Sequence, residues 1–181
     1  MTRLRISART FKAGFFYHAL MIDAHRLIFV HGSESNSQTY KATLLRGLFP
    51  GMLTPDFTGP LTERMTQLEG ILGNQTGWTI IGSSLGGLMA ALFAAQHPGQ
   101  VRKLVLLAPA LILPEFAENL PTSISIPTVI IQGTRDELIP LGLARKLAEK
   151  AFTNLTYLVV DDDHRLHKTA EELDWKAMLA G

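Results

Sequence analysis

The sequence contains no cysteine among its 181 residues. Disulfide bonds, a thiolate nucleophile and a cysteine-ligated zinc site are therefore excluded. Charge is also scarce, because only 18% of the residues are Asp, Glu, Lys or Arg, and 17 basic against 16 acidic side chains give a formal net charge of +1. Without a basic excess, the chain has no electrostatic pattern typical of nucleic-acid binding. We expect no nucleic-acid partner.

Two nucleotide-binding motifs are missing as well. No G-x-G-x-x-G follows the first predicted core strand, and no G-x-x-x-x-G-K-[ST] occurs in the chain. Both motifs bring backbone N–H groups to phosphates, so we expect no nucleotide or other organic cofactor. No apolar stretch is long enough to cross a bilayer, and we expect no membrane span.

Residues 1–26 are the ambiguous part of the chain. Their apolar stretch from Phe15 to Ile22 follows four basic residues, which are Arg3, Arg5, Arg9 and Lys12. The arrangement resembles a targeting segment, but His18 interrupts the apolar part and no clear cleavage site follows. We interpret residues 1–26 as an N-terminal extension or edge strand, and we expect a cytoplasmic protein.

From residue 27 onward, short apolar segments alternate with segments of helical period, which predicts one domain over residues 27–181. A hydrophobic content of 46% is enough for a sizeable core. The alternation is typical of a mainly parallel sheet with helices on both faces. The predicted strands are Leu27–Val30, Gly51–Pro55, Trp78–Ile81, Lys103–Ala108, Thr128–Gln132 and Leu155–Val160. The predicted helices are Ser37–Leu48, Pro60–Leu72, Leu85–His97 and Pro140–Phe152, with a last helix from Thr169 onward.

Several helix ends have matching local chemistry. Pro60 and Pro140 suit first helical positions, and Gly73 suits a C-terminal cap. Thr169 and Glu172 have the T-x-x-E spacing of a capping box, which predicts a helix start at Thr169.

The most informative motif is Gly82-Ser83-Ser84-Leu85-Gly86, a G-x-S-x-G sequence between a predicted strand and a predicted helix. Such a turn exposes a serine hydroxyl at the end of a sheet. The serine backbone is strained there, and side chains at positions 82 and 86 would crowd the turn. We therefore predict that Ser84 is a nucleophile and that Gly82 and Gly86 permit its turn.

The chain resembles the α/β-hydrolase superfamily in four segments, and the likeness covers nearly everything after residue 26. These segments are Phe29-Val30-His31-Gly32, Gly82-Ser83-Ser84-Leu85-Gly86, Gly133-Thr134-Arg135-Asp136 and Asp163-His164. The family order of nucleophile, acid and histidine is reproduced. The resemblance implies a single-domain α/β-hydrolase-like fold with about six strands.

The resemblance also implies a catalytic triad. His164 would act as the base that takes the proton of Ser84, and Asp136 would orient the imidazole. An alternative for Asp136 is that it only caps the turn before the helix at Pro140. An alternative for the base is His167, which lies three residues further on and which we interpret instead as an exposed loop residue.

Two backbone N–H groups are implied as an oxyanion hole. One belongs to Leu85, directly after the nucleophile, and the other belongs to Ser33, after the His31-Gly32 pair. We expect Gly32 to allow a close approach of its loop, and His31 to brace that loop rather than act as a second base.

The run Asp161-Asp162-Asp163 could indicate a cation site. Carboxylates adjacent in sequence need not converge, so we favour a solvated loop and expect no metal site.

The segment between Ala108 and Pro127 has 18 residues, where many members of the family carry a large cap. The resemblance therefore implies a minimal lid and an open site. We predict a serine hydrolase (EC 3.1) that cleaves small carboxylic esters or thioesters through an acyl-Ser84 intermediate. Alternatives are an acyltransferase or perhydrolase, and a non-catalytic protein that binds a ligand or partner on the same scaffold. The sequence leaves monomer and homodimer open.

Overall fold

The computed structural model describes residues 22–121 and 123–180 of the chain. The expectation for residues 1–26 falls largely outside this range, although a short 3-10 helix, η1 (Ala24–Arg26), precedes the first strand. The centre of the fold is a five-stranded, all-parallel sheet in the order β1-β2-β3-β4-β5. Its strands are β1 (Leu27–Val30), β2 (Trp78–Ser83), β3 (Val101–Leu107), β4 (Thr128–Arg135) and β5 (Leu155–Asp163).

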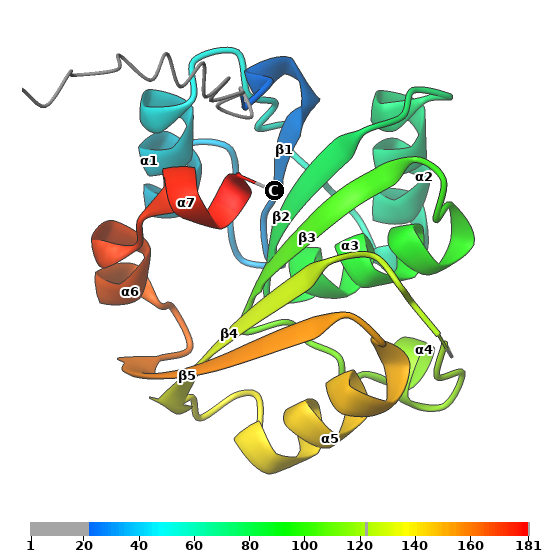
Figure 1. Cartoon of the computed structure of the whole chain (residues 1–181), viewed down its shortest axis with the longest axis vertical. Helices are drawn as coiled ribbons and strands as arrows, with labels where there is room; N and C mark the ends of the chain where they lie inside the picture. Colours follow the sequence, from blue (N-terminus) through cyan, green and yellow to red (C-terminus); the bar gives the residue numbers. More distant parts are fainter. Residues whose placement is uncertain (1–21, 122, 181) are drawn as a thin grey trace, which may run out of the picture.

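Helices cover both faces of the sheet, as the sequence pattern predicts (Figure 1). One face carries α1 (Tyr40–Leu48), α6 (His167–Glu172) and α7 (Trp175–Leu179). The other carries α2 (Leu61–Leu72), α3 (Leu85–Gln96), α4 (Pro114–Ala117) and α5 (Leu141–Ala151). The three-layer arrangement brings the carboxyl ends of all five parallel strands to one edge of the molecule, where ligands bind in such sheets.

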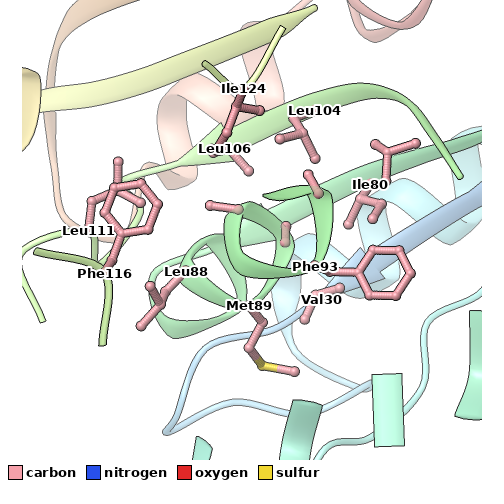
Figure 2. Close-up of a cluster of buried hydrophobic side chains, with 14 of the residues drawn as sticks. Val30, Ile80, Leu88, Met89, Phe93, Leu104, Leu106, Leu111, Phe116 and Ile124 are labelled. Carbon is pink, nitrogen blue, oxygen red and sulfur yellow. The ribbon is translucent and has the colours of Figure 1, made fainter. Parts of the chain in front are cut away.

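Helix α3 is the most deeply buried helix of this arrangement. Eight of its twelve residues are buried, so it lies within the core rather than at its surface. Leu88, Met89 and Phe93 pack against sheet residues such as Ile80 and Leu104 (Figure 2). Each large apolar side chain buried in this way contributes roughly 1.5–3 kcal/mol. This packing holds the N-terminus of α3 firmly against the end of β2.

The predicted strand Gly51–Pro55 is wrong. Only Leu53 pairs with β1, by donating its N–H to Leu27 O and accepting from Phe29 N–H, both at 2.9 Å. Gly51 has a φ of +100°, outside the strand region, and Pro55 has no N–H to donate. The segment therefore adds a single bridge to the edge of the sheet, which has five strands and not six.

The predicted capping box at Thr169 is also wrong. Helix α6 begins at His167, after Leu166 in a left-handed conformation with a φ of +50°. Thr169 donates both its N–H (2.9 Å) and its hydroxyl (2.8 Å) to Asp162 Oδ2. A carboxylate from the preceding strand thus takes the place of the local cap. The predicted last helix is two short helices, α6 and α7.

The other helix ends lie close to their predicted positions. Pro60 and Pro140 each precede their helix by one residue, with extended ψ values of 168° and 114°. Gly73 forms the C-cap of α2 with a φ of +54°, as predicted.

The segment between β3 and β4 is short and covers the core. Leu111 and Phe116 are fully buried on the α3 side of the sheet, and the Phe116 ring lies 6.3 Å from that of Phe152. Figure 2 shows both residues beside Leu88 at the end of α3. The apolar side chains of this segment thus pack in the core, and the lid is minimal.

Candidate active site

Ser84 lies at the junction of β2 and α3, in an unusual backbone conformation. Its φ of +54° and ψ of −118° are costly for a residue other than glycine. Surrounding hydrogen bonds hold this conformation: Ser84 N–H donates to Leu107 O at 2.9 Å, and Ser84 O accepts from the N–H groups of Gly87, Leu88 and Ala110. The strained turn therefore directs the serine out from the end of the sheet.

The glycines around Ser84 allow three backbone segments to meet. A Cβ on Gly82 would lie 2.5 Å from Gly86 O, and a Cβ on Gly86 would overlap the Val30 carbonyl of β1. Real Cβ atoms do not approach other atoms so closely. Helix α3 can start next to β1 only because both positions lack a side chain.

The three residues proposed as a triad from the sequence come together in space. His164 follows directly after β5, and its Nε2 lies 3.0 Å from Ser84 Oγ. Its Nδ1 lies 3.0 Å and 2.9 Å from the two carboxylate oxygens of Asp136. A carboxylate accepts hydrogen bonds, so Nδ1 carries the proton and Nε2 is left to accept from the serine hydroxyl.

Asp136 both caps a turn and contacts His164. Its Oδ1 accepts from the N–H groups of Leu138 (3.0 Å) and Ile139 (2.9 Å), and its side chain is fully buried. The carboxylate therefore caps the turn, as one interpretation expected, and also makes the contact with the imidazole on which the catalytic interpretation depends. The backbone bonds fix the carboxylate so that it can face the imidazole.

His167 does not take the place of His164. Its side chain is exposed and packs against the Tyr40 ring, with ring centroids 4.8 Å apart. Desolvation and the nearby Lys41 and Arg165 charges lower the pKa of His167. The contact with Ser84 Oγ belongs to His164.

The three consecutive aspartates have separate partners. Asp161 pairs with Arg135, whereas Asp163 accepts from the Arg165 N–H at 2.8 Å. All three lie in β5, and Asp162 is buried and binds Thr169, so the expectation of a solvated loop is wrong. Within residues 22–121 and 123–180, no three His, Asp or Glu side chains are grouped so as to hold a metal ion.

The loop after β1 lies against Ser84. A Cβ on Gly32 would be 3.3 Å from Ser84 Cβ. Leu85 is the first residue of α3, so its N–H is among the helix-start donors that have no acceptor within the helix. No hydrogen bond joins the Ser33 N–H to another described residue. Both amides are therefore free to donate to a ligand.

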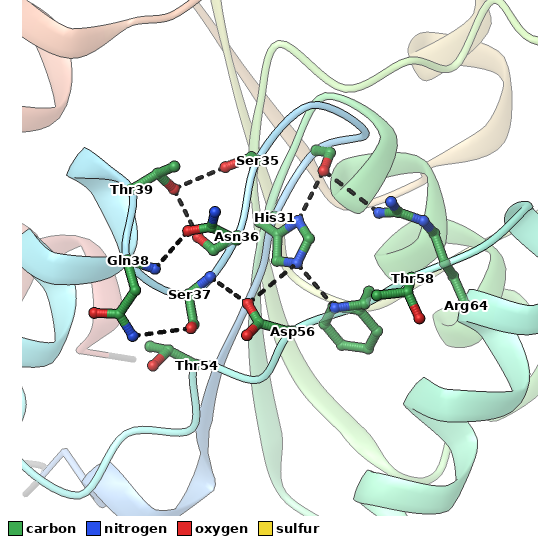
Figure 3. Close-up of polar contacts among 12 residues, drawn as sticks. His31, Ser35, Asn36, Ser37, Gln38, Thr39, Thr54, Asp56, Thr58 and Arg64 are labelled. Atoms are coloured by element: carbon green, nitrogen blue, oxygen red, sulfur yellow. Dashed lines mark hydrogen bonds and ion pairs between the residues drawn. The ribbon is translucent and has the colours of Figure 1, made fainter.

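His31 ties this loop to the rest of the fold. It is 1% exposed, its Nδ1–H donates to Gly32 O at 2.7 Å, and its Nε2 accepts from Phe57 N–H at 2.9 Å (Figure 3). Because both ring nitrogens are occupied by backbone groups, His31 braces the loop, as predicted.

Known proteins resemble the chain in both sequence and structure. The sequence model of the family described as alpha/beta hydrolase fold matches residues 58–123. A candidate hydrolase of the α/β superfamily from Xanthomonas campestris pv. campestris is 28% identical with a TM-score of 0.66, over 84% of this chain and 94% of that chain. The chain has the α/β-hydrolase fold.

Other solved structures share the fold of this chain at lower identity. Est1E from Butyrivibrio proteoclasticus is 18% identical with a TM-score of 0.69, covering 84% of this chain and 86% of that one. The monoacylglycerol lipase of Paleococcus ferrophilus is 16% identical with a TM-score of 0.63, covering 85% and 94%. A search of curated proteins gave no match. No helix in the described part of the chain is both long and apolar enough to cross a membrane.

Two buried polar residues near the candidate site were not predicted from the sequence. Gln132 donates to Ile139 O (2.8 Å) and to Asp136 Oδ2 (3.3 Å), and it accepts from the Tyr157 hydroxyl at 2.6 Å. Burial raises the pKa of Tyr157 to about 12, which keeps the phenol a donor. The signal for Gln132 was a lone polar residue at the end of an apolar strand. Arg64, the second residue, gave no such signal because a charged residue on a helix usually faces solvent.

Proposed function

We propose that this protein is a serine hydrolase that cleaves small carboxylic esters or thioesters through an acyl-Ser84 intermediate. The α/β-hydrolase fold and its esterase-like and lipase neighbours support hydrolase chemistry. The observation that carries the finer proposal is the unbroken hydrogen-bond path from Ser84 Oγ through His164 to Asp136. A serine hydroxyl is a weak nucleophile near neutral pH and needs such a base.

In the acylation step, His164 Nε2 takes the hydroxyl proton while Ser84 Oγ bonds to the carbonyl carbon. The carbonyl oxygen becomes an oxyanion, for which the N–H groups of Ser33 and Leu85 are the proposed donors. His164 then gives its proton to the departing alcohol or thiol, and the bond from the acyl carbon to that group breaks. The acyl group remains on Ser84, and Asp136 stabilises the imidazolium throughout.

Deacylation repeats these steps with water as the nucleophile. His164 takes a proton from the water, which attacks the acyl carbon, and returns it to Ser84 Oγ as the carboxylic acid leaves. Each oxyanion-hole donor typically contributes about 3 kcal/mol to the barrier reduction. No cofactor or metal takes part in either step.

The preference for small acyl groups follows from the short segment between β3 and β4. Because Leu111 and Phe116 are buried in the core, this segment offers no large apolar lid for a long acyl chain. Est1E has been solved with ferulic acid bound, and another neighbour is a monoacylglycerol lipase. Both names are consistent with carboxylic-ester chemistry on this fold.

A fluorophosphonate probe tests the proposal without knowledge of the natural substrate. We expect intact-protein mass spectrometry to find one adduct on the wild type and none on Ser84→Ala, because only an activated serine reacts. Ser83→Ala is the matched control and should still be labelled. Folded wild type that takes up no probe would contradict the proposal and favour a binding protein on this scaffold.

A further inference from the structure

Arg64 is a buried arginine on α2 with an unusual set of partners. It is 6% exposed, and its guanidinium donates only to backbone carbonyls: Gly59 O (2.9 Å), Gly32 O (3.4 Å) and Ser33 O (3.3 Å). Among the described residues, no carboxylate forms an ion pair with it. Burying a cation without a counter-charge is costly. The side chain is therefore expected to serve a purpose beyond core stability.

Two of these carbonyls belong to the loop that lies against the nucleophile. The Gly32 carbonyl receives two donors, His31 Nδ1–H at 2.7 Å and Arg64 at 3.4 Å. Figure 3 shows the Arg64 side chain reaching this loop from α2, while His31 belongs to the loop itself. The position of the Gly32 carbonyl is thus set by the ring of the preceding His31 and by Arg64, which lies outside the loop on α2.

The Gly32 carbonyl and the Ser33 N–H belong to the same peptide group. No described peptide bond is cis, so the two point in opposite directions from one plane. Donors that hold the carbonyl towards His31 and Arg64 therefore hold the Ser33 N–H on the other side. Gly32 itself lies against Ser84, with 3.3 Å between its ideal Cβ position and Ser84 Cβ.

The peptide needs such a clamp because a glycine flanks it. A glycine populates conformations closed to other residues, so the plane between residues 32 and 33 can rotate at little steric cost. A rotated peptide would direct the carbonyl, and not the N–H, at a developing oxyanion. Arg64 opposes this rotation from a rigid base, since α2 is anchored by the fully buried Leu68 and Leu72.

We propose that Arg64 is a positioning residue for the oxyanion hole: it fixes the Gly32–Ser33 peptide so that the Ser33 N–H faces the reacting carbonyl. Its positive charge also polarises this peptide, which strengthens the N–H as a donor. The inference rests on the proposed function, because it assigns the Ser33 amide to the same reaction. Arg64 does not touch the substrate, so its loss should affect kcat and not KM.

Steady-state hydrolysis of p-nitrophenyl acetate by Arg64→Met and Arg64→Lys tests the inference. We expect Arg64→Met to lower kcat about 100-fold, near the loss of one oxyanion donor, with KM within about twofold of wild type. Arg64→Lys keeps the charge and one donor, so its kcat should be about tenfold higher than that of Arg64→Met. The matched control is Arg46→Met, which removes a half-buried arginine that donates to Ser37 O and Thr54 Oγ1 and should retain kcat within about threefold.

A second measurement has a decisive outcome in the wild type, which does not depend on how well the variants fold. In wild type labelled by the fluorophosphonate, the phosphonyl oxygen should accept from the Ser33 amide and move its proton resonance downfield. We expect a smaller shift in Arg64→Lys. A Ser33 resonance that does not move in the wild-type adduct would overturn the inference.

The two proposals fail in different ways. Wild type with no Ser84-dependent adduct would overturn the proposed function and the inference together. Normal labelling of wild type, with kcat unchanged in folded Arg64→Met, would overturn the inference alone. A rise in KM at constant kcat would also contradict it, because that result indicates a substrate-binding role.

Discussion

Single residues in this site carry more than one task. Asp136 caps the turn after β4 through Leu138 and Ile139, and the same carboxylate holds the His164 ring. Its side chain is fully buried, so a change in its charge is not screened by water. An isosteric substitution can therefore separate the structural task from the chemical one.

Asp136→Asn should retain the fold and lose activity. The asparagine oxygen can still accept from the two turn amides, but an uncharged side chain neither stabilises the imidazolium nor enforces the same tautomer. We expect kcat for ester hydrolysis to fall about 10³- to 10⁴-fold, with the unfolding temperature nearly unchanged. Circular dichroism and steady-state kinetics on the same preparations provide both readouts.

The neighbouring exposed acid is the control for this substitution. Glu137→Gln removes the same charge one residue away and should retain kcat. Unchanged turnover in folded Asp136→Asn would indicate that the carboxylate only caps its turn.

At the scale of elements, close contact between β1, β2 and α3 sets the position of Ser84. Gly86 lies where the first turn of α3 touches the Val30 carbonyl. A side chain there would push the helix away from β1, and hence move Ser84 relative to the Gly32 loop. The geometry of the site and the packing of the core are thus coupled.

Gly86→Ala should destabilise the protein and reduce activity. The added methyl overlaps backbone, which cannot rotate away as a side chain can, and overpacking of this kind costs about 1–3 kcal/mol. Urea titration should give a lower free energy of unfolding. Gly70→Ala in α2 is the control, since nothing lies within 4 Å of its added Cβ and alanine is favoured in helices, which predicts a gain of roughly 0.5–1 kcal/mol. Equal stability of the two variants would refute the steric argument.

At the scale of the whole molecule, a helix from a distant part of the chain contacts the turn that holds His164. Lys41 on α1 donates from Nζ to the Arg165 carbonyl at 2.5 Å, directly beyond His164. Burial lowers the pKa of Lys41 to about 8, although the nearby Asp163 and Asp162 carboxylates partly oppose this shift. At neutral pH, the burial of the protonated Lys41 side chain therefore lowers the free energy of unfolding.

This shift predicts a stability that depends on pH. Between pH 8 and 10.5 the unfolded chain binds more protons at Lys41 than the folded protein does, so the free energy of unfolding rises with pH. Relative to Lys41→Met, wild type should gain about 2 kcal/mol between pH 7 and pH 10 in urea titrations. The control is Lys146→Met, which removes an exposed lysine. The difference in free energy of unfolding between wild type and this variant should not change with pH. A constant difference between wild type and Lys41→Met would contradict the lowered pKa.

Local signals were enough to predict most of the fold and the strained turn at Ser84. Hydrophobic period located all five strands, because a buried strand and an amphipathic helix each leave a repeat within a few residues. The turn at Ser84 follows from a strand, a glycine-flanked serine and a helix that are contiguous in the chain. The prediction of a sixth strand was wrong because the pairing of Leu53 depends on β1, which lies more than 20 residues away in the chain.

Contacts between distant segments decided the rest. The amino-acid sequence by itself determined the alternation of strands and helices, the strained serine turn and the chain order of the three triad candidates. Only the tertiary structure decided that His164, and not His167, contacts Ser84. It also decided that Asp162 is buried and accepts from Thr169, and that Arg64 and Gln132 lie near the site. The physical reason is that helical and strand periods are set by neighbours in the chain, whereas a hydrogen bond between remote residues depends on how the finished layers pack.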